Sequence, residues 1–226
     1  MKKSVVICFI LGLFIICGIY AKRKYYDPKQ RLNNARIEVK NLIDSSQLQE
    51  GDLIFQTSLS GQSKAIQFAT KSKYSHCGLI YKEGENYLVF EAVQPVKLTA
   101  IDKWIAKGKD GKYVIRRLKN SNIVLTPSVL IKMKQIENQF KGKNYDLTFE
   151  WSDNKIYCSE LIWKVYQRAT GIEIGKLQRL CDFDLTNEVV KNKMKERYGN
   201  KIPVNEIVIS PEAIFESELL ETVKSN

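Results

Sequence analysis

The chain of 226 residues has little of the chemistry that many catalytic and metal sites use. It contains one histidine, His76, which excludes a histidine-rich metal site. It contains five cysteines, none spaced as C-x-x-C, so neither a disulfide framework nor a zinc cluster is indicated. Two of them lie in the N-terminal apolar run, and three lie in the body of the chain: Cys77, Cys158 and Cys181. This inventory permits a cysteine–histidine nucleophilic pair that works without metal or cofactor.

Basic residues outnumber acidic ones: the chain has 36 Lys and Arg against 25 Asp and Glu, which gives a formal net charge of +11. Such a balance favours anionic surfaces as partners, for example a membrane or a cell-wall polymer. The basic residues are scattered, and the chain lacks an arginine-rich block and any nucleic-acid-binding motif. We therefore expect no nucleic-acid partner.

The N-terminus carries the longest apolar run, residues 4–21, between lysines on both sides. Eighteen helical residues span about 27 Å, close to the hydrocarbon thickness of a bilayer. We expect residues 1–24 to be a signal anchor, and two alternatives stay open: cleavage after Ala21, or lipidation of Cys17. Each predicts a membrane-anchored or exported protein with its catalytic domain on the extracytoplasmic side.

The remaining chain, roughly 200 residues, has the length of one domain with a full core. Residues 25–49 hold apolar side chains at helical spacing, including Ala35 and Leu42, and predict an amphipathic linker helix. Residues 50–226 alternate strand and helix patterns and predict one α+β domain. Strands are expected at 51–56, 76–82, 87–93, 113–118 and 206–210, and helices at 62–70, 100–108, 127–141, 157–170 and from 211. Thr99 is expected to cap the helix that follows it. Segment 172–205 is charged and hard to assign.

The two runs 76–82 and 87–93 predict a β-hairpin that fixes which side chains share a face. With a two-residue turn at Glu83-Gly84, His76 lies opposite Glu91, whose carboxylate then accepts the imidazole N–H. A four-residue turn keeps the same face, whereas a three-residue turn breaks it. Cys77, next along the strand, points to the opposite face and into the core.

Cys158 stands at the first turn of the helix predicted at 157–170. Unpaired backbone N–H groups and the helix dipole favour an anion there and lower the pKa of a thiol. A lone cysteine or histidine is commonly a buried core residue. That interpretation weakens when the single histidine, a glutamate on its face and a cysteine at a helix start occur together.

Five strings in order resemble one known family: G-D-L-I-F-Q, S-x-Y-S-H-C-G-L-I, F-E-A-V, G-K-N-Y-D and Y-C-S-E-L-I. They are similar to the permuted papain-like branch of the NlpC superfamily, the YiiX/YebB-like cysteine hydrolases. The similarity spans about residues 50–168, and S-P-E-A-I-F-E-S at 210–217 resembles the closing segment of that family. Segment 172–205 matches none of its motifs, and we expect this insertion to shape the substrate cleft.

The resemblance implies an antiparallel sheet packed against helices and a residue role at each matching position. It implies Cys158 as nucleophile, His76 as base and Glu91 as the residue that orients the imidazole. The backbone N–H of Cys158 is the natural oxyanion donor, with the hydroxyls of Tyr157 and Tyr145 as further candidates. Should Glu91 not lie beside His76, Asp52 is the next candidate for the residue that orients the imidazole.

Three functions are consistent with these residues. The first is a membrane-anchored cysteine peptidase or amidase acting on a peptide or acyl-amide substrate, with peptidoglycan stem peptides as a candidate source. The second is an acyltransferase or lipid hydrolase of the lecithin:retinol acyltransferase-like type, which shares the permuted order. The third is a catalytically silent binding module, against which the complete set of three residues argues.

Overall fold

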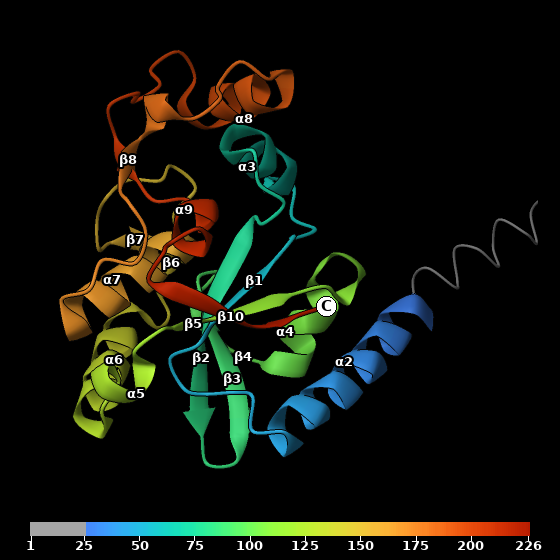
Figure 1. Ribbon diagram of the computed structural model, residues 1–226. Helices are drawn as coiled ribbons and strands as arrows, with labels where there is room; N and C mark the ends of the chain where they lie inside the picture. The colour runs from blue at the N-terminus through green and yellow to red at the C-terminus, as the bar shows by residue number, and fades with distance from the viewer. Residues whose placement is uncertain (1–25) are drawn as a thin grey trace, which may run out of the picture.

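The computed structural model describes residues 26–226 and centres on a six-stranded antiparallel sheet (Figure 1). Its strand order is β10-β5-β1-β2-β3-β4. The bounds are β1 Leu53–Gln56, β2 His76–Glu83, β3 Asn86–Glu91, β4 Lys97–Ala100, β5 Val114–Leu118 and β10 Leu220–Ser225. Two short ladders complete the strands: β6 Asn144–Tyr145 with β7 Lys155–Ile156, and β8 Gln178–Arg179 with β9 Ile207–Val208.

Helices cover both faces of the sheet and extend beyond one end of it, where α3 and α8 lie at the top of Figure 1. Their bounds are α2 Asp27–Asp44, α3 Ser63–Thr70, α4 Ile101–Lys107, α5 Ser121–Val124, α6 Pro127–Phe140, α7 Cys158–Thr170, α8 Glu188–Tyr198 and α9 Pro211–Phe215. This arrangement confirms the expected α+β class with an antiparallel sheet packed against helices.

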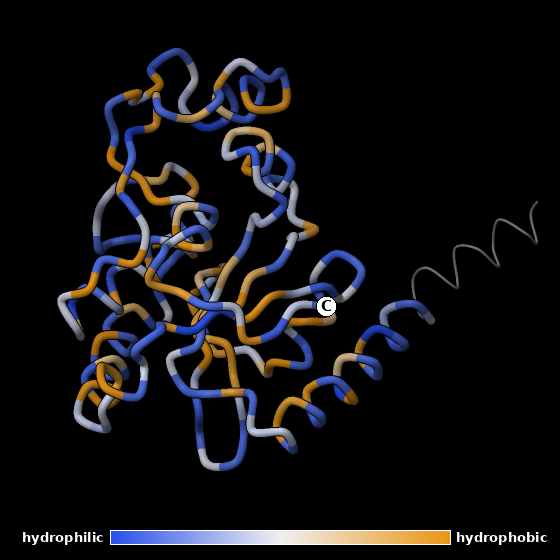
Figure 2. The backbone as a smooth tube through the Cα atoms, viewed as in Figure 1, coloured by the Kyte–Doolittle hydropathy of each residue, from blue (hydrophilic) through white to orange (hydrophobic). Residues whose placement is uncertain are grey.

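Side-chain alternation along the strands divides the core into two layers. Leu53, Phe55 and Leu79 pack with α6 and α7 on one face, whereas Ile54 and Ile80 pack with α2 and α4 on the other. Successive side chains of a strand point to opposite faces, so each central strand contributes to both layers. Figure 2 shows the apolar residues gathered in these central strands and in the helices around them. The two packed layers therefore hold the central strands in place.

Helix boundaries follow local signals in the sequence. Thr126 caps α6 by accepting a hydrogen bond from the backbone N–H of Val129, and Pro127 opens that helix without a donor to satisfy. Gly171, with φ of 78°, ends α7 in the left-handed region that disfavours other residues. Both boundaries confirm the expected helices.

The hairpin forms, but its turn lies one residue later than expected. Gly84 and Glu85 connect β2 to β3, because Glu83 pairs with Asn86. Gly84 adopts φ of 59°, as the first residue of a two-residue hairpin turn requires. The pairing therefore shifts by two positions, so Glu91 does not lie directly opposite His76. A shift of two keeps the face, and the two residues still share it.

Two strands of the six-stranded sheet were not expected, and one helix cap was assigned wrongly. β4 includes Thr99, whereas α4 begins after Ala100 and has no side-chain cap. β10 pairs with β5 at the edge of the sheet, although its sequence L-E-T-V-K-S is short and does not alternate regularly. Pairing with an existing strand satisfies the backbone of such a segment and overrides its weak local pattern.

The helix predicted at 25–49 is α2, and it packs on the domain. Its buried residues Ala35, Val39 and Leu42 join the core layer of α4, while Ile43 is 38% exposed. The expected membrane segment at 4–21 lies outside the described residues. Across residues 26–226, every helix is too short or too polar to span a bilayer.

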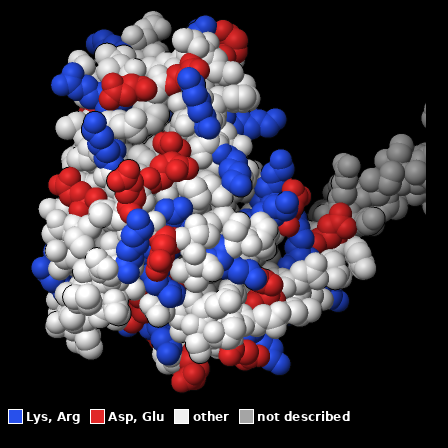
Figure 3. All heavy atoms as spheres, viewed as in Figure 1, with Lys and Arg blue, Asp and Glu red and all other residues white. Residues whose placement is uncertain are grey.

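Lysines and arginines are interleaved with acidic residues over the face shown in Figure 3. The scattered pattern expected from the sequence therefore holds on that face.

Candidate active site

His76 and Glu91 meet at one end of the central hairpin. His76 is the first residue of β2 and Glu91 is the last residue of β3. The imidazole Nε2 donates to the Glu91 carboxylate Oε2 over 2.7 Å, and both side chains are almost fully buried. Gly78 allows the two strands to approach, because a Cβ at this position would lie 2.3 Å from the Val89 side chain. The expected contact between imidazole and carboxylate is present.

Two further side chains fix this pair, and the sequence reasoning missed both. Thr99 Oγ1 donates to the other carboxylate oxygen of Glu91 over 2.6 Å. The indole of Trp104 stacks on the imidazole, with ring centroids 5.7 Å apart and planes inclined by 26°. Had K-L-T-A at 97–100 been recognised as a strand beside β3, Thr99 would have been a candidate. A donor on one side and an aromatic face on the other restrict both side chains to one orientation.

Cys158 lies at the N-terminus of α7, as expected, and is 3% exposed. Because Cys158 is the first residue of the helix, its backbone N–H has no partner within the helix. The apolar stripe of α7, including Leu161 and Val165, packs against the sheet face that carries Cys77. This packing brings the start of α7 to the start of β2, beside His76.

The electrostatics of Cys158 and His76 favour a thiolate–imidazolium pair. The pKa of Cys158 lies well below its usual range because the thiolate accepts hydrogen bonds from the Cys77 thiol and from His76, which outweigh burial. Burial alone would lower the pKa of His76, but contact with Cys158 and Glu91 raises it to about 10. The pKa of Glu91 is lowered, since His76 and Thr99 together outweigh its burial. The three groups stabilise one another in their charged forms.

Cys77 is fully buried on the face opposite His76, as alternation predicts. Its assignment to the core alone was incomplete. That face is the one covered by α7, so the Cys77 thiol reaches Cys158 and burial keeps its own pKa raised well above the usual range. A protonated Cys77 therefore donates to the deprotonated Cys158.

The two tyrosine candidates both line the cavity around Cys158. The Tyr157 hydroxyl accepts a hydrogen bond from the backbone N–H of Ile209 over 3.0 Å and is buried beside the core. The Tyr145 hydroxyl accepts from Gln62 Nε2 over 2.8 Å and lines the cavity around Cys158. Tyr145 additionally lines the groove beside His76.

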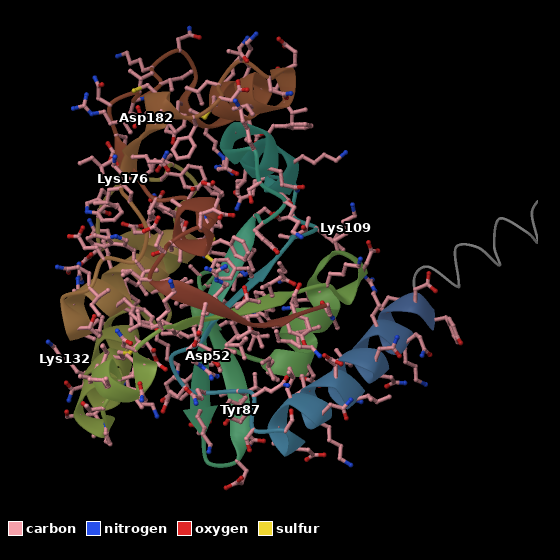
Figure 4. All side chains as sticks on the ribbon, in the orientation of Figure 1. Asp52, Tyr87, Lys109, Lys132, Lys176 and Asp182 are labelled. Atoms are coloured by element: carbon pink, nitrogen blue, oxygen red, sulfur yellow. The ribbon has the colours of Figure 1, made fainter. Side chains whose placement is uncertain are left out.

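Asp52 does not belong to the site. Arg117 binds both of its carboxylate oxygens, at 2.6 and 2.7 Å, and Asp52 is 1% exposed. Figure 4 labels Asp52 in the lower half of the molecule, whereas α3 and α8 lie at the top. Asp52 precedes β1 and His76 begins the antiparallel β2, so the two residues stand at opposite ends of the strands. The proposal of Asp52 as a site residue is wrong.

Comparison with known proteins shows the family of the chain. Residues 47–224 match the family model described as permuted papain-like amidase enzymes, YaeF/YiiX. The chain belongs to this family. It is 49% identical to YiiX of Escherichia coli K12 over 177 residues, which cover 78% of this chain and 86% of that protein. It is accordingly a cysteine-type hydrolase of the amidase and peptidase class, as the five motifs implied. The matched range includes segment 172–205, which resembled none of the family's motifs.

A solved structure agrees with the fold. The crystal structure of YiiX from Escherichia coli O157:H7 superposes with a TM-score of 0.76 at 49% identity, covering 80% of this chain and 98% of that one. That protein is described as a metalloprotein. Among residues 26–226 of this chain, no three His, Cys, Asp or Glu side chains are grouped so that they could hold a metal ion.

Proposed function

We propose that this chain hydrolyses amide bonds through an acyl-thioester on Cys158, with His76 as acid and base and Glu91 as the orienting residue. The observation that carries the proposal is the buried His76–Glu91 contact of 2.7 Å beside the thiol at the start of α7. Thiolate, base and orienting carboxylate are the three parts that nucleophilic acyl transfer requires.

The mechanism has two half-reactions. The Cys158 thiolate attacks the carbonyl carbon, and the backbone N–H of Cys158 stabilises the oxyanion that forms. With Nε2 bound to Glu91, Nδ1 of His76 remains to protonate the leaving amine as the C–N bond breaks. His76, now neutral, takes a proton from water, whose oxygen attacks the thioester. The acid leaves, and the thiolate–imidazolium pair is restored.

Capture of the acyl-enzyme tests this mechanism. We expect full-length protein incubated with acyl-amide and wall-peptide substrates, then quenched in acid, to carry the acyl mass on Cys158 in peptide mass spectra. Cys158→Ala should carry none, whereas Cys181→Ser, which removes an exposed cysteine, should behave as the unmodified protein. Turnover retained in Cys158→Ala would contradict the proposal.

We further propose that the natural substrates are peptides of the cell envelope and that residues 4–21 tether the enzyme to a membrane. The apolar run and the net charge of +11 support this location. The full-length protein should sediment with membranes and resist 1 M salt, in which exposed charges are screened beyond about 3 Å. A mature protein that begins at Lys22 and remains in the soluble fraction would indicate a cleaved signal instead.

Acyl transfer to an acceptor other than water is the alternative outcome for the same thioester. The product decides between them: hydrolysis releases free acid, whereas transfer yields an acylated acceptor in proportion to the acceptor added.

A further inference from the structure

Tyr157, the residue before the proposed nucleophile, is held at each of its polar groups. Its hydroxyl accepts a hydrogen bond from the Ile209 N–H over 3.0 Å, and its carbonyl accepts one from the Leu161 N–H over 3.0 Å. Its own N–H donates to the Glu160 carboxylate Oε2 over 3.4 Å. The Tyr157 carbonyl and the Cys158 N–H lie in one planar peptide. The contacts of Tyr157 therefore set the direction of the Cys158 N–H.

Glu160 makes this contact as half of a buried ion pair. Its carboxylate Oε1 lies 2.7 Å from Lys164 Nζ, and the two side chains are 0% and 4% exposed. Lys164 Nζ also donates to the Ser152 carbonyl over 2.7 Å and to Asp153 Oδ1 over 2.9 Å, so each of its three protons has a partner. Apolar residues often replace a buried ion pair without loss of stability. Stability alone therefore does not account for this pair.

The segment between β6 and β7 is tied to the same lysine and contacts Tyr157. Asp153, in this segment, binds the Arg168 guanidinium through both carboxylate oxygens, at 2.8 and 2.9 Å, as well as Lys164. Phe149, also in this segment, packs edge-on against the Tyr157 ring, with centroids 5.1 Å apart and planes at 90°. One lysine thus joins the carboxylate that binds the Tyr157 N–H to the segment that packs on the Tyr157 ring.

We propose that Glu160, held by Lys164, is a positioning residue for the reaction: through Tyr157 it directs the Cys158 N–H at the oxyanion. The inference rests on the proposed function. A carboxylate has an acceptor oxygen for each of its two partners, Lys164 and the Tyr157 N–H, whereas an amide has one oxygen and one donor group. In Glu160→Gln the amide must turn its NH₂ towards the ammonium or towards the Tyr157 N–H, so one of the two contacts is lost.

Two reactions of Cys158 in the full-length protein test this role. Acylation by p-nitrophenyl acetate passes through an oxyanion, whereas alkylation by iodoacetamide displaces iodide and forms none. At pH 9 the low pKa of Cys158 keeps it a thiolate, and Glu160, whose pKa burial raises to about 8, is ionised. Glu160→Gln should acylate about 10- to 100-fold more slowly, because loss of an oxyanion donor costs about 10²–10³ in rate. It should alkylate at an unchanged rate.

Glu160→Asp keeps the test valid should Glu160→Gln fail to fold. It retains the charge beside Lys164 but is one methylene shorter, so its carboxylate cannot reach both partners. Acylation should again slow, and alkylation should not. Glu188→Gln is the control, since it removes an exposed carboxylate that pairs with Lys191 on α8 over 2.8 Å, and it should change neither rate. A native-like Glu160 variant that acylates at the original rate, or that loses equally in both reactions, overturns the inference.

The acyl adduct separates this inference from the proposed function. Should the unmodified protein release p-nitrophenolate without an acetyl group on Cys158 in peptide mass spectra, the nucleophile and the positioning role are overturned together. An acetyl group on Cys158 that forms equally fast in Glu160→Gln overturns the positioning role alone. An acetyl group that forms slowly in Glu160→Gln, with alkylation unchanged, supports both.

Discussion

The two walls of the site differ in how firmly the fold holds them. The sheet body, which we define as the six-stranded sheet with α4, α6 and α7, carries Cys158, His76 and Glu91 in two extensive core layers. The cap segment, residues 172–205, contributes α8 and a small cluster of three buried apolar residues, Leu180, Val190 and Met194, while Ile174 near its start packs in the core of the body. The body thus holds the proposed reacting groups, and the cap forms one wall of the pocket beside Cys158.

This difference separates two requirements of the site, the positions of the reacting groups and the fit of the substrate. Reacting groups must keep their geometry within fractions of an ångström, which a packed sheet provides. A pocket wall need only match the size of a substrate group, and a thin layer with few buried contacts can be replaced at little cost to the rest of the fold. Changes in the body should therefore alter rate and global stability, and changes in the cap should alter local stability and selectivity.

The largest expected effect is on the rate, from Glu91→Gln in the body. A neutral amide stabilises the imidazolium less, so kcat/KM should fall by about 10² to 10⁴. Because Glu91 helps to raise the pKa of His76 to about 10, the alkaline limb of the pH–rate profile should move to lower pH. Glu188→Gln, an exposed carboxylate of the cap, is the matched control and should change neither quantity. A fully active Glu91→Gln would show that another group orients the imidazole.

The same substitution in the two regions compares their stability. Leu161→Ala in α7 removes a residue that is 1% exposed, and it should cost about 2–5 kcal/mol in the free energy of unfolding. Leu180→Ala in the cap removes a residue that is 7% exposed in a small cluster, and it should cost about 1 kcal/mol or less in urea unfolding. Hydrogen exchange should then quicken at the amides of α8 only. Equal global costs would show that cap and body unfold as one unit.

The smallest expected effect comes from Cys77→Val, which keeps the size of a buried side chain and removes its donor. The pKa of Cys158 should rise, because its thiolate loses the hydrogen bond from Cys77. The acid limb of the pH–rate profile should therefore move to higher pH. Iodoacetamide labelling of Cys158 at pH 6 should slow, by about tenfold for each pH unit that its pKa lies above 6. Cys181→Ser serves as the exposed control. An unchanged profile would mean that His76 alone sets the charge state of the nucleophile.

Local patterns in the sequence determined much of this molecule. Side-chain alternation along the strands placed His76 and Glu91 on one face. Helix-capping, proline and glycine residues fixed the bounds of α6 and α7. Both patterns depend only on dihedral preferences and on hydrogen bonds between neighbouring residues. The proposed reacting residues were selected by scarcity and motif order: the chain has one histidine and a cysteine at a helix start, within strings that resemble a known family.

Contacts between distant segments were decided only by the tertiary structure. Thr99 reaches Glu91, Trp104 stacks on His76, and Cys77 meets Cys158 because strands and helices far apart in the chain pack together. Asp52 failed as a site residue for the same reason, since its partner Arg117 lies 65 positions away. The apolar pocket likewise needs α3 and α8 side by side, and no periodicity in either helix specifies its neighbour. Sequence sets the conformation of each segment, whereas packing of the whole chain selects which side chains share a site.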